Sequence, residues 1–504
     1  MRTFIIAKRI YLLIVCSLLL AQCKRETSSL NEQNAGMLTF SVGNTVFTIS
    51  KNDVTGLSGN TNSRNGVIPV FTANGKVYVN DTEQISGVSA VDLTMPLTYK
   101  VIDNNGLSYE YKVKLMSFTG LPIVTINTDG GKEIVSEDDY LNATFALDPN
   151  GNDSAKVISA TGSIKGRGNS TWGFIKKPYK FKFDKKTSLF GSAPSKEWVL
   201  LANYADKTLI RNYLANTLSA SMKMAFSPMS EFVELYLNGK YNGNYMLTDQ
   251  VEVSPSRVNI DELTTTDTDP SKLTGGYMME IDQRIYETLD APFFESRFFP
   301  VTVKSPKTPT DGQMSYIKGY VLEAENVLYG TNYRDPVNGF RKYFDEDSFI
   351  KWFIINEIFK NVDSQSFSSI DFYKPRNGKI FFGPVWDFDL GAGNATHNPS
   401  CEVATGFYTL YHKWFVQMYE DPAFKVKVAE IWKQYRTTFL NMNNLITDEG
   451  KLLEVSELMN FRLWPNFSDP SWCVIQGKAN YAEHVAWLRQ FLTKRIDWLD
   501  QQFK

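Results

Sequence analysis

The sequence predicts an α+β protein, in which a small all-β sandwich precedes a larger domain with a β-rich front and a helical rear. Three observations support this prediction. Short alternating apolar runs separated by Asn-Gly and Gly-Asn turns fill residues 37–118, a pattern typical of a β-sandwich. Alternating runs recur to about residue 282, whereas apolar spacing of three to four residues dominates after residue 313. The length of 504 residues and the hydrophobic content of 43% are sufficient for several domains with a large core.

The N-terminal segment is expected to target and tether the protein. A basic start is followed by the apolar stretch 10–21, which is typical of a secretory signal and too short for a membrane-spanning helix. The sequence LAQC, ending at Cys23, resembles a bacterial lipoprotein box, although Gln22 stands where a small residue is usual. We therefore predict a lipoprotein signal peptide over residues 1–23 and a polar tether over 24–36. The protein would be exported and lipid-anchored through Cys23 in the bacterial cell envelope, on its periplasmic or surface face.

Composition limits the partners, metal sites and disulfides that the chain can be expected to have. A net charge of −2 without a basic run argues against nucleic acid as a partner. The three histidines show no metal-ligand spacing and are expected to be structural. Export would permit a disulfide between Cys401 and Cys473, and the sequence leaves this pairing open. Residues 37–118 carry no recognisable chemistry, so the predicted immunoglobulin-like sandwich is interpreted as a spacer or binding module.

The acidic segment 379–394, KIFFGPVWDFDLGAGN, resembles a functional site more than any other part of the chain. Residues 379–382 read as a short strand. If the segment that follows is extended, Asp387 and Asp389 share one face, while Trp386 and the other apolar residues pack on the opposite face. Two adjacent carboxylates repel each other unless a cation compensates them, and oxygen ligands suit Mg2+. The alternative is a solvated segment with two surface acids.

A basic strand and a glycine turn form a second candidate region. In residues 176–183, KKPYKFKF, aromatic residues alternate with Lys180 and Lys182, so both lysines lie on one face of a half-buried strand. The preceding segment 164–172, IKGRGNSTW, offers backbone N–H groups and Arg167 in a tight turn. Together these groups could bind phosphate. The simpler alternative is a basic surface strand beside a glycine turn.

Two further elements follow in the middle of the chain. Residues 206–222 show helical apolar spacing with Asp206 as the expected N-cap. Arg211 and Asn212 lie beside the apolar stripe of this helix and could point towards a site or into solvent. Residues 231–250 form the clearest hairpin, because an Asn-Gly turn separates two alternating runs.

The rear of the chain is predicted to be helical. Apolar periodicity predicts four helices, over residues 313–328, 345–360, 424–440 and 481–503. The second helix is followed by Asn361-Val362-Asp363, which places a carboxylate in an irregular segment where functional groups often lie. A simple Asx turn at the helix end is the alternative interpretation.

Seven segments in this order resemble the CotH kinase family, the atypical kinases named for a spore-coat protein. They are GRGNSTW, KKPYKFKF, NYADKTLIRN, ELYLNGKYNGNY, GGYMMEID, NEIFKNVD and FGPVWDFDLG. The resemblance covers about residues 122–504, and it implies that residues 119–504 form a two-lobed, kinase-like domain. The chain has neither the H-R-D-x-x-x-x-N nor the D-F-G motif of ordinary kinases, from which the family also departs.

The resemblance implies a nucleotide site. Phosphoryl transfer requires positive charge on the phosphates, a metal ion that bridges their oxygens and a group that orients the incoming hydroxyl. With ATP as the nucleotide, Lys180 or Lys182 together with Arg167 would hold the phosphates. Trp386 could stack on the base or pack inward.

The resemblance also implies metal and catalytic residues. Asp387 would bind Mg2+, with Asp389 as the second candidate. Asp363 would be the catalytic or second metal-contacting carboxylate, and Asn361 would assist it.

Two functions from different classes remain open at this point. The first is an ATP- and Mg2+-dependent kinase that acts on Ser or Thr hydroxyls of a protein substrate. The second is a non-catalytic binding or scaffold lipoprotein that retains the kinase-like fold, since ATP is scarce outside the cytoplasm. A glycoside hydrolase is disfavoured because Asp387 and Asp389 lie on one segment and not across a cleft.

Overall fold

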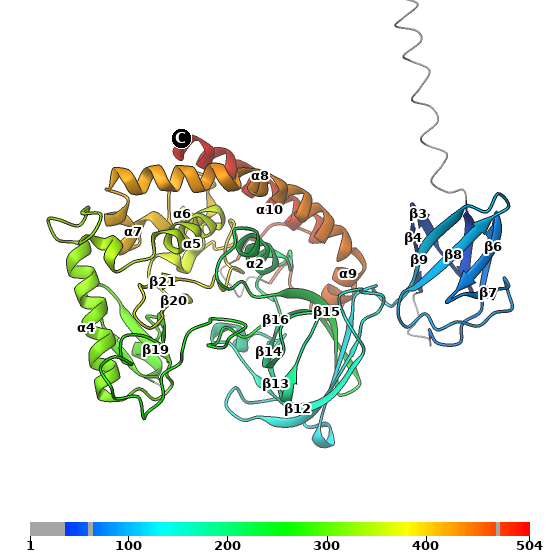
Figure 1. Cartoon of the computed structure of the whole chain (residues 1–504), viewed down its shortest axis with the longest axis horizontal. Helices are drawn as coiled ribbons and strands as arrows, with labels where there is room; N and C mark the ends of the chain where they lie inside the picture. The colour runs from blue at the N-terminus through cyan, green and yellow to red at the C-terminus, as the bar shows by residue number, and fades with distance from the viewer. Residues whose placement is uncertain (1–35, 59–63, 290, 470–473) are drawn as a thin grey trace, which may run out of the picture. The chain divides into compact units, whose positions relative to one another are not determined.

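The computed structural model of the protein describes residues 36–58, 64–289, 291–469 and 474–504 (Figure 1). The chain forms two compact units. The smaller unit extends to Pro122 and includes Asp148–Ala155, and the larger unit comprises Ile123–Leu147 and Lys156–Lys504. The predicted signal peptide, the tether up to residue 35, Cys23 and Cys473 lie outside the described residues.

The smaller unit is all-β, as predicted. One sheet has the order β2-β1-β5 and the other has the order β3-β4-β9-β8-β6-β7. The strands are β1 (Met37–Val42), β2 (Thr45–Val46), β3 (Thr48–Ser50), β4 (Asp53–Ser58), β5 (Pro69–Ala73), β6 (Gly75–Val79), β7 (Thr82–Gln84), β8 (Leu97–Asp103) and β9 (Ser108–Ser117). Both sheets contribute to one hydrophobic core, in which the rings of Phe40 and Tyr99 lie 5.2 Å apart. Asn150 holds the segment Asp148–Ala155 against the rest of this unit, because its side-chain amide donates to the carbonyl of Ser117 at 2.8 Å.

A closed seven-stranded barrel begins the larger unit. Its strand order is β10-β11-β12-β13-β14-β16-β15. The strands are β10 (Ile123–Thr128), β11 (Leu141–Asp148), β12 (Ile158–Gly166), β13 (Tyr179–Thr187), β14 (Ser195–Leu201), β15 (Ser230–Leu237) and β16 (Lys240–Asp249). Parallel pairing of β10 with β15 closes the barrel.

The alternation predicted for residues 176–183 is present in β13. Phe181 and Phe183 are buried and pack on Phe145, with ring centroids 5.2 and 4.9 Å apart. The intervening lysines therefore lie on the outer face of the barrel. The predicted hairpin is likewise confirmed, since β15 and β16 are joined by Asn238-Gly239 with φ angles of 51° and 75°, the conformation that two-residue hairpins favour.

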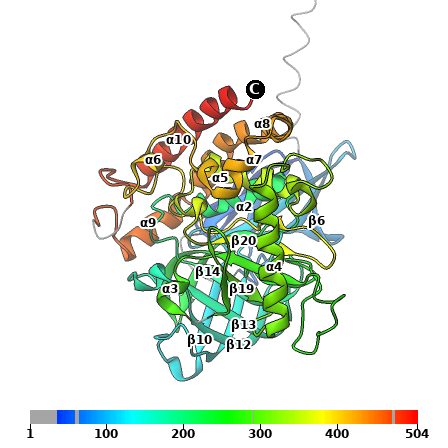
Figure 2. The ribbon, with the colours of Figure 1, turned by 90° about the vertical axis from the view of Figure 1, so that its left-hand side faces the viewer.

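An antiparallel five-stranded sheet follows the barrel in the chain. Its order is β18-β19-β17-β20-β21. The strands are β17 (Tyr277–Ile281), β18 (Phe293–Glu295), β19 (Pro300–Ser305), β20 (Ile370–Lys374) and β21 (Phe381–Phe382). Figure 2 shows helix α4 (Asp311–Leu328) beside this sheet, and the ring of Tyr316 on the helix stacks on Tyr277 of β17 at 6.2 Å.

The four helices predicted for the rear of the chain are present, which confirms the α+β class. They are α4, α5 (Glu346–Phe359), α8 (Pro422–Leu452) and α10 (Tyr481–Gln502). The third helix extends twelve residues beyond its predicted end. Further helices are α2 (Arg211–Ser221), α3 (Ile285–Thr288), α6 (Pro399–Glu402), α7 (Lys413–Met418) and α9 (Glu454–Leu463). No helix in the described part of the chain combines the length and apolar character needed to cross a membrane.

Helix α5 is the centre of the helical region. Ten of its 14 residues are buried, which is typical of a helix surrounded on all sides. An ion pair of 2.6 Å between Glu357 on α5 and Arg495 on α10 is completely buried. The carboxylate of Glu357 also accepts the backbone N–H groups of Tyr408 and Leu410, at 3.0 and 2.7 Å. The segment that leaves α5 towards Asp363 therefore starts from a firmly held position.

Packing in the barrel core predicts that substitutions of neighbouring residues of β13 differ greatly in their effect on the free energy of unfolding. We expect Phe181→Ala to lower the free energy of unfolding by about 3–5 kcal/mol, because it removes a buried ring, and Lys182→Ala to lower it by less than about 1 kcal/mol. All ten tryptophans belong to the larger unit, so tryptophan fluorescence during guanidinium denaturation follows this unit. Equal effects of the two substitutions would contradict the packing described here.

Candidate functional site

A cavity of about 190 Å³ lies within the larger unit. The loop between β12 and β13, the segment 201–204 after β14, the first turns of α2, the five-stranded sheet and the acidic segment all contribute to its lining. Its side chains combine three aromatic rings with cations and carboxylates. The lining includes Arg167, Phe174, Lys176, Tyr204, Asn212, Glu280, Arg284, Lys304, Ser369, Trp386, Asp387 and Asp389.

The glycine turn predicted as a phosphate cradle forms one wall of this cavity. Gly168 has a φ of 98°, and a Cβ atom there would lie 2.1 Å from Thr171 Oγ1, so glycine is required. The loop is closed by a hydrogen bond of 3.2 Å from Arg167 N to Pro178 O. The guanidinium of Arg167 stacks over the Trp386 ring at 5.6 Å. Burial lowers the pKa of Arg167, and the nearby Asp387 carboxylate opposes this shift.

The acidic segment is not the extended strand that its alternation predicts. Residues 383–388 are irregular and 389–394 form turns. Asp387 has a φ of 65°, in the left-handed region that residues with a Cβ atom rarely adopt. Phe388 is buried against Phe359, with ring centroids 5.1 Å apart. Asp387 and Asp389 nevertheless both line the cavity, so the structure brings the two predicted metal ligands together through a different backbone conformation.

The carboxylates of this region repel one another. Burial, followed by the Asp387 charge, raises the pKa of Asp389 well above its ordinary value. The same two causes raise the pKa of Asp363 to about 7, although the Arg284 guanidinium opposes the shift. Asp363 does not contribute to the cavity lining but interacts electrostatically with Asp387 and Arg284, which do. The acids predicted from two distant segments therefore lie within one electrostatic cluster.

Asn361 connects Asp363 with Asp387. It caps the short 3-10 helix Val362–Gln365, and its side-chain oxygen accepts the N–H of Asp363 at 3.3 Å. Its side-chain amide donates to the backbone carbonyl of Asp387 at 3.2 Å. The hydroxyl of Ser369 donates to the carboxylate of Asp387 at 3.3 Å. Asn361 thus contacts the backbone of both acidic residues.

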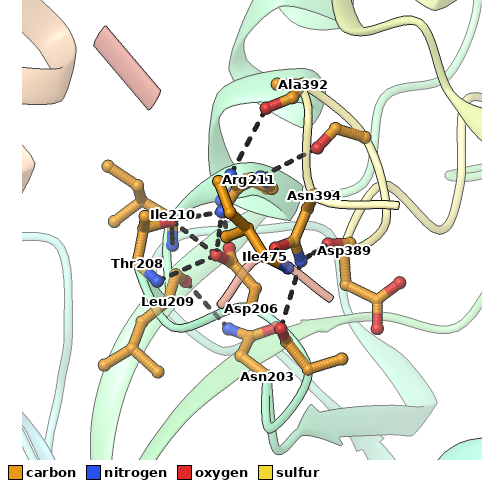
Figure 3. Close-up of polar contacts among 12 residues, drawn as sticks. Asn203, Asp206, Thr208, Leu209, Ile210, Arg211, Asp389, Ala392, Asn394 and Ile475 are labelled. Carbon is orange, nitrogen blue, oxygen red and sulfur yellow. Dashed lines mark hydrogen bonds and ion pairs between the residues drawn. The ribbon is translucent and has the colours of Figure 1, made fainter. Parts of the chain in front are cut away.

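The buried guanidinium of Arg211 holds the C-terminal part of the acidic segment in place (Figure 3). Arg211 forms an ion pair of 2.5 Å with Asp206 and donates to the carbonyls of Gly391 and Ala392 at 2.9 and 3.3 Å. The Asn394 side-chain amide donates to the carbonyl of Asp389 at 2.7 Å. The sequence alone allows Arg211 to point towards a site or into solvent, and in the structure it points towards the acidic segment.

The predicted N-cap role of Asp206 is wrong. Helix α2 begins at Arg211 with Ile210 in the N-cap position. Asp206 instead accepts hydrogen bonds from the backbone N–H groups of Thr208 and Arg211 at 2.9 and 2.8 Å. Because its carboxylate also pairs with the Arg211 side chain, it closes a turn that delays the start of the helix.

The structure places the two predicted phosphate-binding lysines away from the cavity. Lys180 forms an ion pair with Glu197 of the neighbouring strand, and Lys182 lies 3.8 Å from the same carboxylate. Neither contributes to the lining. Alternation correctly predicts that they share a face, but it does not reveal which elements face them.

Besides Arg167, three basic side chains line the cavity, and they belong to Lys304, Arg284 and Lys176. Lys304 on β19 lies 3.0 Å from both Glu280 and Asp371. Although burial opposes the shift, these two carboxylates raise the pKa of Lys304 above its ordinary value. The guanidinium of Arg284 donates to Asp282 at 2.9 and 3.1 Å. Neither Lys304 nor Arg284 is recognisable as a site residue from the sequence, because each is an isolated basic residue at a strand or helix end without a motif of its own.

The third cation, Lys176, is completely buried. Its ammonium donates to the carbonyls of Ala202, at 2.7 Å, and Asn244, and it lies 4.6 Å from the centroid of the Tyr245 ring. Burial lowers its pKa to about 7. Since its donors are directed at backbone carbonyls, Lys176 mainly ties the cavity wall to the barrel.

Comparison with known proteins assigns the chain to a class. The family model described as CotH kinase protein matches residues 164–499. The chain therefore belongs to the CotH kinase family, and the family's kinase-like function agrees with a cavity that combines cations, carboxylates and aromatic rings. No curated protein matches the chain.

One solved structure that matches is a protein from Bacteroides thetaiotaomicron, described provisionally as a glycoside hydrolase. The two share 13% sequence identity, and the match covers 59% of this chain and 88% of that protein with a TM-score of 0.17. A likeness of this strength carries no argument about fold or function.

The acidic cluster suits a divalent cation. Among the described residues, no three His, Cys, Asp or Glu side chains are arranged as a complete metal site. Mg2+ does not require one, because it commonly binds through one or two carboxylates, water and substrate phosphates. Asp387 and Asp389 provide two carboxylates, and burial together with the Asp387 charge raises the pKa of Asp389, a repulsion that a bound cation would relieve. These residues therefore fit Mg2+.

The raised pKa of Asp363 predicts a pH-dependent stability. Folding favours the protonated acid, so its contribution is fully present below about pH 4 and is lost as the pH rises through about 7. We expect Asp363→Asn to raise the melting temperature of the metal-free protein relative to wild type, with a difference that grows from pH 4 to pH 8. Differential scanning fluorimetry in the presence of a chelator measures this difference.

Asp335→Asn provides a control of opposite sign. Asp335 is exposed, and the backbone N–H groups of Asn338 and Val337 lower its pKa. Its substitution should therefore lower stability above about pH 4. A melting-temperature difference for Asp363→Asn that is constant across the pH range would contradict the proposed burial and repulsion.

Proposed function

We propose that this protein catalyses ATP- and Mg2+-dependent phosphoryl transfer to Ser or Thr hydroxyls of a protein substrate. One observation carries the proposal: the acids Asp387 and Asp389 and the cations Arg167, Arg284 and Lys304 line one cavity in a member of the CotH kinase family. Such an arrangement supplies the positioning and electrostatic stabilisation on which phosphoryl transfer depends.

The phosphates would contact groups from two sides of the cavity. The glycine turn at Gly168 offers backbone N–H groups, and Arg167 projects from the same loop. Lys304 and Arg284 approach from the sheet. Lys304 with its partner Glu280 provides the lysine–glutamate pair that phosphoryl-transfer sites use to hold a lysine in place. We therefore propose Lys304 and Arg284 for the role that the sequence suggested for the lysines of β13.

The aromatic rings offer a site for the nucleotide base. Phe174 and Tyr204 lie with ring centroids 4.9 Å apart and both line the cavity. Trp386 is half-buried, packs against the cluster that includes Val258 and contacts Arg167. Because the Trp386 ring already contacts the Arg167 guanidinium and this cluster, the Phe174–Tyr204 pair is the better stacking surface for the base.

Asp363 is suited to act as the general base. A pKa of about 7 keeps a useful fraction of its carboxylate ionised at neutral pH while leaving it basic enough to accept a proton. It would take the proton of the acceptor hydroxyl as that oxygen attacks the terminal phosphorus and the bond to the ADP oxygen breaks. Asp387 and Asp389 would hold the Mg2+ ion, which supplies charge neutralisation when bound.

We also propose that the protein is exported and anchored by a lipid on Cys23. This proposal is supported by the basic start, the apolar stretch 10–21 and the LAQC sequence. A protein substrate in the cell envelope would then be its partner. The polar tether would allow the rest of the chain to move along the membrane surface.

The proposed metal role predicts the behaviour of Asp387→Asn. We expect wild type to bind ATP tightly only with Mg2+, and the variant to lose this metal dependence and phosphoryl transfer, because an amide is a poor ligand for Mg2+ and removes a charge. Calorimetry of the fragment 36–504 measures the binding, with Asp335→Asn as a surface control. Absence of Mg2+-dependent ATP binding in wild type would favour the non-catalytic scaffold.

A matched pair of lysines tests the phosphate site. We expect Lys304→Met to weaken Mg-ATP binding about tenfold or more, because charge-assisted hydrogen bonds to the phosphates are lost. Lys180→Met should bind as wild type does. Circular dichroism monitors folding, since Lys304→Met leaves Glu280 and Asp371 without their cation. Weakened binding by Lys180→Met alone would restore the original sequence-based assignment.

A further inference from the structure

The peptide group between Asp387 and Phe388 is held at both edges by asparagine side chains. Its carbonyl, on Asp387, accepts the side-chain amide of Asn361 at 3.2 Å. Its N–H, on Phe388, donates to the side-chain oxygen of Asn212 at 2.7 Å. Asn361 and Asn212 are only 4% and 7% exposed. One asparagine follows α5 and the other lies in the first turn of α2, so two distant helices meet at this peptide.

We propose that Asn212 and Asn361 are positioning residues that act as an amide clamp on the Asp387–Phe388 peptide. The clamp sets the position of the Asp387 and Asp389 carboxylates for a divalent cation. This inference rests on the proposed function, which assigns those carboxylates to the metal.

The backbone at Asp387 needs such support. Its φ of 65° lies in the left-handed region, where a side chain with a Cβ atom is disfavoured and persists only when its surroundings hold it. The carboxylates on either side of the peptide also repel each other. Without the two hydrogen bonds, the peptide could rotate towards a relaxed conformation, and the carboxylates would separate.

The clamp also connects the metal ligands with the general base. The side-chain oxygen of Asn361 accepts the N–H of Asp363 at 3.3 Å while its amide holds Asp387. One planar amide therefore fixes the spacing between the backbones of these two acids. This coupling would keep the acceptor hydroxyl and the metal-bound phosphate in a constant relation.

Asn212 has its own support on the opposite side. Its side-chain amide donates to the side-chain oxygen of Asn203 at 3.3 Å, and Asn203 donates to the carbonyl of Leu209 at 2.9 Å. The adjacent Arg211 is held by Asp206. The start of α2 therefore presents Asn212 in one orientation, with its oxygen towards the N–H of Phe388.

The test compares Asn212→Ala with Asn216→Ala in the fragment 36–504. Asn216 lies one turn further along α2, and its side-chain amide donates to the hydroxyl of Ser230 at 2.9 Å, so it controls for loss of an asparagine from this helix. Hydrogen–deuterium exchange of residues 385–390 reports on the Phe388 amide. Calorimetric titration with Mg2+ reports on the carboxylates.

For Asn212→Ala we expect faster exchange in residues 385–390 and a dissociation constant for Mg2+ raised about tenfold or more, the usual range for losing a partner that orients a metal ligand. Asn216→Ala should match wild type in both measurements. Asn212→Asp retains an acceptor for the Phe388 N–H, and it should therefore keep the slow exchange even if Asn212→Ala folds poorly.

Each result decides between distinct conclusions. Wild-type exchange or wild-type Mg2+ affinity in Asn212→Ala overturns the clamp. A wild-type protein that binds no Mg2+, either alone or together with ATP, overturns the proposed function and the metal-positioning role of the clamp. Fast exchange in Asn212→Asp also overturns the clamp, because the acceptor alone would then be insufficient.

Discussion

The buried ion pair between Arg211 and Asp206 is the interaction on which the candidate site depends. Both side chains are almost completely inaccessible, and removing one partner of such a pair typically costs about 3–5 kcal/mol because the other charge stays buried. Arg211 also holds the carbonyls of Gly391 and Ala392, about 180 residues later in the chain. The barrel-side helix α2 therefore determines where the acidic segment runs, and α5 adds a second attachment through Asn361.

The cluster formed by Asp363, Asp387 and Asp389 destabilises the region that Arg211 and Asn361 hold in place. Burial and mutual repulsion raise the pKa values of Asp363 and Asp389, and Asp387 occupies a disfavoured backbone conformation. Sites of chemistry commonly store such strain, which the surrounding structure supports. A bound cation would relieve the repulsion, so binding and folding of this region are thermodynamically linked.

Local patterns predicted most of the fold, whereas long-range contacts determined the site. The alternation in β13, the turn at Asn238-Gly239 and the periodicity of α5 depend on neighbouring residues, and the structure confirms them. The left-handed conformation of Asp387 depends on partners far away in the chain, so alternation wrongly suggested a strand there. Lys180 was assigned to the correct face of its strand, but Glu197 on the adjacent strand occupies that face. Nothing local distinguishes Lys304 as the lysine that lines the cavity.

The groups that hold the backbone of the acidic segment are mostly uncharged. Three neutral asparagines, Asn212, Asn361 and Asn394, bind its backbone, and the nearby guanidinium of Arg211 is directed at Asp206 and at backbone carbonyls. A lysine or arginine in place of these asparagines could form the same backbone contacts only as a donor, and its charge would neutralise the carboxylates. Amide side chains both donate and accept without adding charge. The segment is therefore fixed in position without an added positive charge, and the repulsion among its acids remains for a bound cation to relieve.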